Sequence, residues 1–191
     1  MEKIPTVFLR NPENMKLVTR EVNPDAAWVL EGIGMPTIKK DGTNVRVTVR
    51  RVTVRNGVVV YAEKRRNPTR EEKANGAEPG YVPVDERDPS DKHILRAIIE
   101  TNYSDWPDGE WSCEALGPKI QGGVESSTPC LYCFSLFPTP LPSWENPRTW
   151  LEMYNCLEAH EIEGIVWHDK ENHRYAKIKR RDFGLPWPVK K

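Results

Sequence analysis

Lys39 is the residue of this chain whose neighbours best suit it to act as a nucleophile. It follows the apolar stretch Met35–Ile38 and stands two positions before Asp41-Gly42, a turn-forming pair. The alternating run Val45–Arg50 comes next and is typical of a half-buried strand. This order predicts one amine held rigidly at a corner between two strands, as a nucleophile requires. The alternative is an ordinary β-hairpin with Asp41-Gly42 at its bend and solvated lysines.

Four further charged residues lie where a strand pattern alone does not require them. Glu114 interrupts an apolar strand pattern, and Glu163 comes directly before another apolar run. Lys177 and Lys179 flank Ile178, so a strand would direct both amines to the same face. A charge directed at a core is costly unless it is paired or bound to a ligand. The four residues therefore predict either a ligand site or an internal network of salt bridges.

The elements that must position these residues are mostly strands. The strands are predicted at 45–52, 58–62, 111–116, 131–137, 164–167 and 175–179, the first two joined by a turn at Asn56-Gly57. Ser90 is predicted to cap one helix, which carries Ile94, Leu95, Ile98 and Ile99 on one face. Asn146 is predicted to cap a second, with Pro147 in its first turn and Trp150, Leu151, Tyr154 and Leu157 at helical spacing. The polar segment 67–89 is predicted to be a lid or a mobile loop.

The composition bounds the class of protein. The chain has 191 residues, 28 basic and 28 acidic, with 38% hydrophobic residues and a mean hydropathy of −0.67. This predicts one α+β domain over 1–191, mostly antiparallel, with helices packed on its sheets. No apolar run approaches the ~20 residues of a membrane span, and the N-terminus lacks a signal-peptide pattern, so we expect a cytoplasmic protein (in the host cytoplasm if viral) with no membrane partner. Because the charges balance, a nucleic acid would have to bind a local patch. Two stretches are basic enough: 46–66 and 177–181.

The four cysteines raise the question of a metal. Cys130 and Cys133, followed by Cys156 and His160, superficially have zinc-ligand spacing. However, residues three apart on the strand predicted at 131–137 would point to opposite faces, and no glycine-rich knuckle surrounds them. We therefore expect buried structural cysteines rather than a metal site, and no disulfides.

Five segments, taken in order, resemble the motifs of the covalent nucleotidyltransferases, the superfamily of ATP-dependent RNA ligases, DNA ligases and mRNA capping enzymes. The likeness is closest to the phage-type RNA ligases and extends from about Thr37 to Lys179. The segments are Lys39-Lys40-Asp41-Gly42-Thr43-Asn44 (motif I), Cys113–Lys119 (motif III), Tyr132-Cys133-Phe134 (motif IIIa), Glu163–Val166 (motif IV) and Lys177-Ile178-Lys179 (motif V).

The resemblance implies an α+β nucleotidyltransferase domain, of the ATP-grasp-like ligase adenylylation type, and an enzyme of RNA repair. Its substrates would be ATP and RNA with 5′-phosphate and 3′-hydroxyl ends, its metal Mg²⁺ (or Mn²⁺), and no protein partner is implied. Lys39 would become covalently bound to AMP, which would pass to the 5′-phosphate before the 3′-hydroxyl seals the strand. A lysine amine attacks only when neutral, whereas its ordinary pKa is ~10.4. Lys40, Lys177, Lys179 and a bound metal ion would lower that pKa by their positive charge.

The resemblance also implies a role for each matching residue. Lys39 would be the nucleophile, with Lys177 and Lys179 on the α-phosphate as further catalytic residues. The nucleotide would also contact Asn44, Arg66, Glu114, Phe134 and Glu163, with Glu114 on the ribose and Phe134 stacked on adenine. Arg65 is the alternative to Arg66. Asp41 and Glu163 would hold the metal ion through water.

Several alternatives stay open. Position 40 is a second lysine, so Lys40 is the alternative nucleophile, although the spacing to Asp41-Gly42 favours Lys39. We expect a bare nucleotidyltransferase module, because the chain has no room after motif V for an oligonucleotide-binding or RNA-specific C-terminal domain. The alternative functions are a DNA ligase, a GTP-using guanylyltransferase and an inactive RNA-binding module.

Overall fold

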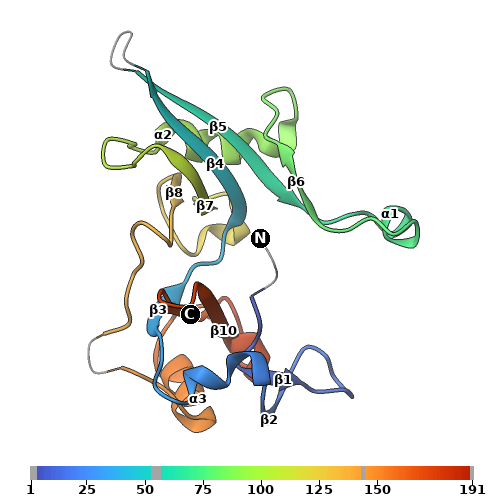
Figure 1. The fold of residues 1–191 in the computed structure, drawn as a ribbon. Coiled ribbons are helices and arrows are strands. Elements are labelled where there is room, and N and C mark those ends of the chain that lie inside the picture. Colours follow the sequence, from blue (N-terminus) through green and yellow to red (C-terminus); the bar gives the residue numbers. More distant parts are fainter. Residues whose placement is uncertain (1–3, 53–56, 143–144, 190–191) are drawn as a thin grey trace. The chain divides into compact units, whose positions relative to one another are not determined.

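The computed structural model describes residues 4–52, 57–142 and 145–189 (Figure 1). The chain divides into two compact units, each described by itself. Met1–Lys40 and Thr139–Lys191 together form the first, here called the terminal unit, and Asp41–Pro138 forms the second, the central unit. Within the described residues no helix has the length and apolar character needed to cross a membrane.

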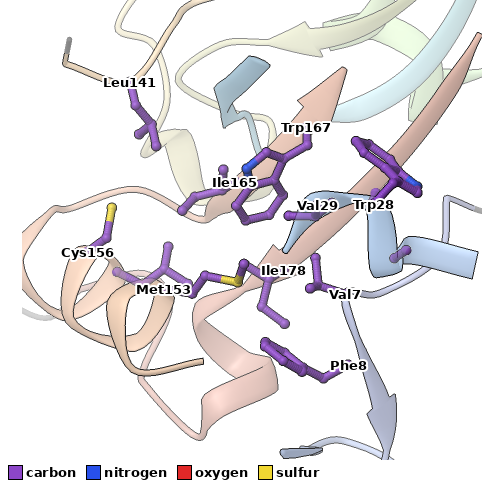
Figure 2. Packing of buried hydrophobic residues seen from close by; sticks show 13 residues of the cluster. Val7, Phe8, Trp28, Val29, Leu141, Met153, Cys156, Ile165, Trp167 and Ile178 are labelled. Carbon is purple, nitrogen blue, oxygen red and sulfur yellow. The ribbon is translucent and has the colours of Figure 1, made fainter. Parts of the chain in front are cut away.

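The terminal unit is built on a three-stranded antiparallel sheet of order β10-β9-β3. The bounds of these strands are Met35–Lys39 for β3, Gly164–Asp169 for β9 and Arg174–Lys179 for β10. Helix α3 (Trp150–Ala159), the strand pair β1 (Phe8–Arg10) and β2 (Val18–Val22), and the 3₁₀ segments Pro24–Val29 and Arg180–Phe183 complete the unit. Its core is apolar, with Phe8, Met153, Trp167 and Ile178 fully buried (Figure 2). The core fixes β9 and β10, and therefore the charged residues at their ends.

The central unit contains a five-stranded antiparallel sheet of order β6-β5-β4-β7-β8. The strands are β4 (Thr43–Val52), β5 (Gly57–Arg66), β6 (Gly80–Pro83), β7 (Gly109–Leu116) and β8 (Cys130–Tyr132). Two helices belong to the unit, α1 (Arg70–Ala74) and α2 (Lys92–Glu100), together with the short 3₁₀ segments Pro89–Asp91 and Gln121–Gly123. Val45, Val47 and Val49 alternate along β4 and are fully buried in one cluster with Ile94 and Ala97 of α2. The opposite face of the sheet is left to polar side chains.

The predicted α+β class with mostly antiparallel sheets is confirmed. The β4–β5 hairpin is also confirmed, since Val52 pairs with Gly57, while Asn56 of its turn lies outside the described residues. The hairpin alternative for Asp41-Gly42 is wrong. Strand β3 pairs with β9 and strand β4 pairs with β5 and β7, so this corner carries the chain from one sheet to another.

Both helix starts differ from their predictions. Helix α3 begins after Thr149 rather than Asn146, because Thr149 and Glu152 form a capping box that satisfies the first free amides. Its exposed Leu151 points away from the core, which takes Met153, Cys156 and Leu157 instead. Helix α2 begins after Asp91, one residue beyond Ser90, and its Ile99 is exposed.

Two further segments differ from the sequence predictions. The strand predicted at 131–137 ends at Tyr132, because a turn follows in which the Phe137 amide donates to the carbonyl of Cys133 at 2.9 Å. The segment 67–89, predicted as a lid or mobile loop, contains α1 and β6. Strand β6 pairs with β5 from Glu63 to Arg66 and so extends the sheet of the central unit.

Candidate functional site

Lys39 is the last residue of β3, and its amine is paired. The Nζ atom of Lys39 donates to the Glu163 carboxylate and, at 3.1 Å, to the carbonyl of Lys40. Both side chains are largely buried, at 20% exposure for Lys39 and 9% for Glu163. The pairing follows from the sheet, because Lys39 lies opposite Gly164 in the β3–β9 register and Glu163 directly precedes Gly164. Burial in this geometry fixes the direction in which the amine points.

Gly164 is the first residue of β9, the middle strand of the three-stranded sheet. It pairs with Lys39 on β3 and with Lys179 on β10. A Cβ atom added here would overlap the backbone carbonyl oxygen of Ile178 and approach the Cα atom of Lys179 to 3.0 Å. Only glycine therefore allows β10 to lie this close to β9. The sequence shows this glycine, but only the register reveals that it separates two of the predicted catalytic lysines.

Lys177 and Lys179 project from the same face of β10, as predicted. They alternate with Ala176 and Ile178, which are buried on the other face. Burial, together with the positive charges of Lys39 and Lys179, lowers the pKa of Lys177 to about 8. The N-terminal segment fixes the backbone at this point. The Lys177 amide donates to the carbonyl of Pro5 at 2.9 Å, and the Val7 amide donates to the carbonyl of Lys177 at 3.0 Å. The amines of Lys39, Lys177 and Lys179 lie close enough for the charges of the other two to affect the pKa of Lys177.

A hollow of about 870 Å³ opens beside Lys177 and Lys179, within the terminal unit. Its cationic lining residues are Arg10, Lys16, Lys177, Lys179 and Arg181. One carboxylate, Asp182, also lines it and pairs with Arg10 at 2.7 Å. A hollow with five cations and one anion in its wall has the charge and size to receive phosphate groups. Arg10 and Lys16 were not predicted, since β1 and the turn after it have no recognisable motif.

The polar sheet face of the central unit holds the predicted Asn44 and Glu114 side by side. They face each other in the β4–β7 register, and Tyr132 of β8 lies opposite Glu114 on its other side. The Asn44 side-chain amide donates to the carbonyl of Cys113 at 3.2 Å, and its oxygen accepts from the Tyr81 hydroxyl at 2.6 Å. Asn44 therefore ties three strands together. Tyr81 was not foreseen, because it lies in the segment predicted to be a loop.

Strand alternation distinguishes Arg65 from Arg66. Arg65 pairs with Tyr81 across β5 and β6, and directly opposed residues point to the same side, so Arg65 shares the polar face with Asn44. Arg66 has the opposite parity and binds both carboxylate oxygens of Glu72 at 2.8 Å, beyond the end of the sheet. Arg65, the alternative to Arg66, is thus the arginine on the face with Asn44 and Glu114.

The remaining predicted residues of the central unit lie in its loops. The backbone amide of Asp41 donates to the Glu125 carboxylate at 3.1 Å. Gly42 packs so tightly on β7 that an added Cβ would lie 2.5 Å from the carbonyl oxygen of Ala115. Phe134 is half-buried in the turn after β8, rather than in a strand. This turn position differs from the strand that the sequence predicted over 131–137.

The structure thus brings four predicted residues together in the terminal unit: Lys39, Glu163, Lys177 and Lys179. Asp41, Asn44, Arg66, Glu114 and Phe134 belong to the central unit, where Asn44 and Glu114 are neighbours. No protein-family model matches the chain, and no curated protein is found to be similar to it.

Proposed function

We propose that this protein is an ATP-dependent RNA ligase with a nucleotidyltransferase fold, which joins a 5′-phosphate to a 3′-hydroxyl through a lysyl-AMP intermediate on Lys39. The observation that supports this most is the buried pairing of Lys39 with Glu163, beside the amines of Lys177 and Lys179. Lys177 lies near the positive charges of Lys39 and Lys179 and near the negative charges of Glu163 and Asp182, so this part of the terminal unit gathers the cations that a phosphate group would need.

The first chemical step would form a bond between Nζ of Lys39 and the α-phosphorus of ATP and break the bond to the leaving pyrophosphate. An ammonium group has no lone pair, so Lys39 must lose a proton before it attacks. The Glu163 carboxylate already accepts a hydrogen bond from that amine and is therefore positioned to receive the proton. Nearby positive charge favours the neutral amine, and Lys177 supplies such a charge near neutral pH because its pKa is about 8.

Phosphoryl transfer develops negative charge on the phosphate oxygens, so fixed cations contribute most to catalysis. We assign this role to Lys177 and Lys179, and the binding of the outgoing pyrophosphate to the hollow that Arg10, Lys16 and Arg181 also line. Carboxylate oxygens are the ligands that Mg²⁺ prefers, and the Glu163 carboxylate would hold the ion through water. The ion would add further positive charge at the phosphates.

On the polar sheet face, Asn44 and Glu114 would contact phosphate and ribose, Phe134 would stack on adenine, and Arg65 replaces Arg66 as the arginine of this set. This replacement is supported by the strand parity that aligns Arg65 with Tyr81 and Asn44. The resemblance to RNA ligases, rather than the geometry of this face, is the reason for choosing ATP and RNA.

The test is covalent labelling. Wild-type protein incubated with ATP labelled at the α-phosphate and Mg²⁺ should carry the label through denaturation, and Lys39→Ala should not. Lys40→Ala is the matched control, since it removes the adjacent amine and should still become labelled. A wild-type protein that stays unlabelled with ATP and with GTP would overturn the proposal, and labelling by GTP alone would favour a guanylyltransferase.

Substrate choice needs a second experiment on the labelled enzyme. Single-stranded RNA with a 5′-phosphate, nicked RNA and nicked DNA should be offered in parallel. We expect transfer of AMP to an RNA 5′-phosphate and sealing of RNA. Sealing of nicked DNA in preference to both RNA substrates would replace the RNA ligase by a DNA ligase.

A further inference from the structure

Glu145, Cys156 and His160 form a second cluster of chemically active side chains in the terminal unit. One donor atom of each lies within 4.8 Å of the other two. Cys156 belongs to α3, and Figure 2 shows it at the edge of the apolar core. His160 follows one turn later, as the C-cap of the same helix. None of the three residues takes part in the proposed ligase chemistry.

The local fold holds the cluster in place. His160 is four residues beyond Cys156, and its amide donates to the Cys156 carbonyl at 3.1 Å, so both side chains lie on one face of the helix end. The buried Arg180 donates to the carbonyls of Leu157 and, at 2.7 Å, of His160. Glu145 reaches the pair from the preceding connection, where its amide donates to the carbonyl of Pro142 at 2.8 Å. The helix end is therefore fixed independently of the side-chain cluster.

The spacing of the donor atoms suits a tetrahedral metal ion. His160 Nε2 and Glu145 Oε1 are 3.1 Å apart. Metal bonds of about 2.1 Å at tetrahedral angles would place these two atoms about 3.4 Å apart, and a sulfur ligand about 3.6 Å from each. The Cys156 sulfur lies within 4.8 Å of both, so it needs an approach of at most about 1.2 Å. Rotation of the Glu145 and His160 side chains, at 25% and 34% exposure, supplies that movement and an entry path.

We propose that Glu145, Cys156 and His160 bind one Zn²⁺ ion, with water in the fourth position. Thiolate, imidazole and carboxylate form the mixed sulfur, nitrogen and oxygen set that zinc accepts, whereas Mg²⁺ prefers oxygen alone. With Glu145 and Cys156 both ionised, their two negative charges balance the charge of the ion. The site would fasten the connection before α3 to the end of that helix.

Metal binding must displace a proton from Cys156. Burial and the neighbouring Glu145 raise the pKa of this thiol to about 12, so it is protonated at neutral pH in the metal-free protein. A bound zinc ion converts a coordinating thiol to thiolate.

The competing explanation is a hydrogen-bonded triad without a metal, in which the Glu145 carboxylate accepts from both His160 and Cys156. Such a triad would also join the connection to the helix. The two explanations differ in whether a thiolate–metal bond forms, so the test must detect that bond directly rather than stability alone.

Chelator-treated protein comprising residues 1–191, kept reduced, should be titrated with Co²⁺, which reports thiolate ligation through a ligand-to-metal charge-transfer band. We expect one equivalent of Co²⁺ to bind and to produce this band. Zn²⁺ should displace the Co²⁺ and abolish the band, whereas excess Mg²⁺ should leave the band unchanged. Cys156→Ser should abolish the band. His160→Gln and Glu145→Gln should weaken binding by about 100-fold or more, since loss of outer partners alone costs roughly 10–100-fold.

Cys130→Ser and His93→Gln are the matched controls, because they remove a cysteine and an exposed histidine of the central unit. Both should bind Co²⁺ as the wild type does. The proposal is overturned if no charge-transfer band forms, if the band survives Cys156→Ser, or if His160→Gln binds Co²⁺ as tightly as the wild type. The half-exposed His160 keeps the test valid should Cys156→Ser fail to fold, because His160→Gln leaves the buried helix face intact.

Discussion

The amine of Lys39 donates a hydrogen bond to the carboxylate of Glu163, 124 residues further along the chain. The β3–β9 register brings the two residues together, and both side chains are largely withdrawn from water. Removing one partner of a buried pair leaves the other charge uncompensated, which usually costs about 3–5 kcal/mol. Loss of either partner alone should therefore destabilise the terminal unit, and the pair fixes the orientation of the proposed nucleophile.

Glu163→Gln should lower the rate of covalent labelling by about 100-fold near neutral pH. The amide keeps the shape of the side chain but cannot take a proton from the Lys39 ammonium, nor supply negative charge for a metal ion. The measurement is the initial rate of labelling with ATP labelled at the α-phosphate, with thermal unfolding recorded beside it. Glu161→Gln, an exposed neighbour, should label at the wild-type rate. Wild-type labelling by Glu163→Gln would mean that the pair is structural only.

Gly164→Ala should lower the free energy of unfolding by about 1–3 kcal/mol. The new methyl group would overlap the carbonyl of Ile178 and force β10 away from β9, so Lys179 would move relative to Lys39 and labelling would fall as well. Urea unfolding and the labelling rate together test this. Gly80→Ala is the control, because its Cβ would meet nothing within 4 Å. Equal stability of the two variants would contradict the packing argument.

Arg65→Ala should raise the ATP concentration needed for half-maximal labelling by about tenfold or more, the loss expected for a hydrogen bond to a charged group. Arg66→Ala should change it by less than about twofold, because Arg66 is engaged by Glu72 on the other side of the strand. The two adjacent arginines serve as controls for each other. A larger effect for Arg66→Ala would restore the choice that the sequence pattern favoured.

Alternation was the part of the structure that the sequence revealed best. Lys177 and Lys179 flank a buried isoleucine, and the period of two that places them on one face depends on the backbone alone. Valines at 45, 47 and 49 predicted β4 and its buried face for the same reason. Capping was less predictable, because Asn146-Pro147 and Thr149-Glu152 both carry start signals and only one can begin α3.

Register and long-range pairing were beyond the sequence. Nothing local shows that Gly164 lies between Lys39 and Lys179, or that Tyr81 bonds to Asn44, since both contacts arise from strand pairing between distant segments. Likewise, the register between β5 and β6 decides which of Arg65 and Arg66 shares the polar sheet face with Tyr81. Cys156 and His160 have zinc-ligand spacing in the sequence only together with Cys130 and Cys133, whereas the structure places them beside Glu145, whose carboxylate comes from a connection with no recognisable spacing to Cys156.

Lys177→Met should raise the free energy of unfolding near pH 7 by on the order of 1–2 kcal/mol, allowing for solvent screening of the charge. The pKa of Lys177 is about 8 in the folded protein, against 10.5 ordinarily, so the unfolded chain binds more protons between these values. Wild-type stability should therefore rise with pH across this window, and below pH 8 the full cost of the buried ammonium remains. Methionine fills a similar space without a charge. The substitution therefore removes both the cost of the buried ammonium and the increase of stability with pH.

Urea unfolding of the two proteins from about pH 7 to about pH 10 tests this expectation, with the difference between them narrowing as the pH increases. Taking the difference cancels the other groups that titrate in this range. Lys170→Met removes an exposed lysine of the same unit and should follow the wild-type curve. A constant difference between wild type and Lys177→Met over the whole range would show that Lys177 keeps its ordinary pKa in the folded protein. It would then be fully charged near pH 8, and the crowding of cations beside Lys39 would be weaker than the packing of β10 implies.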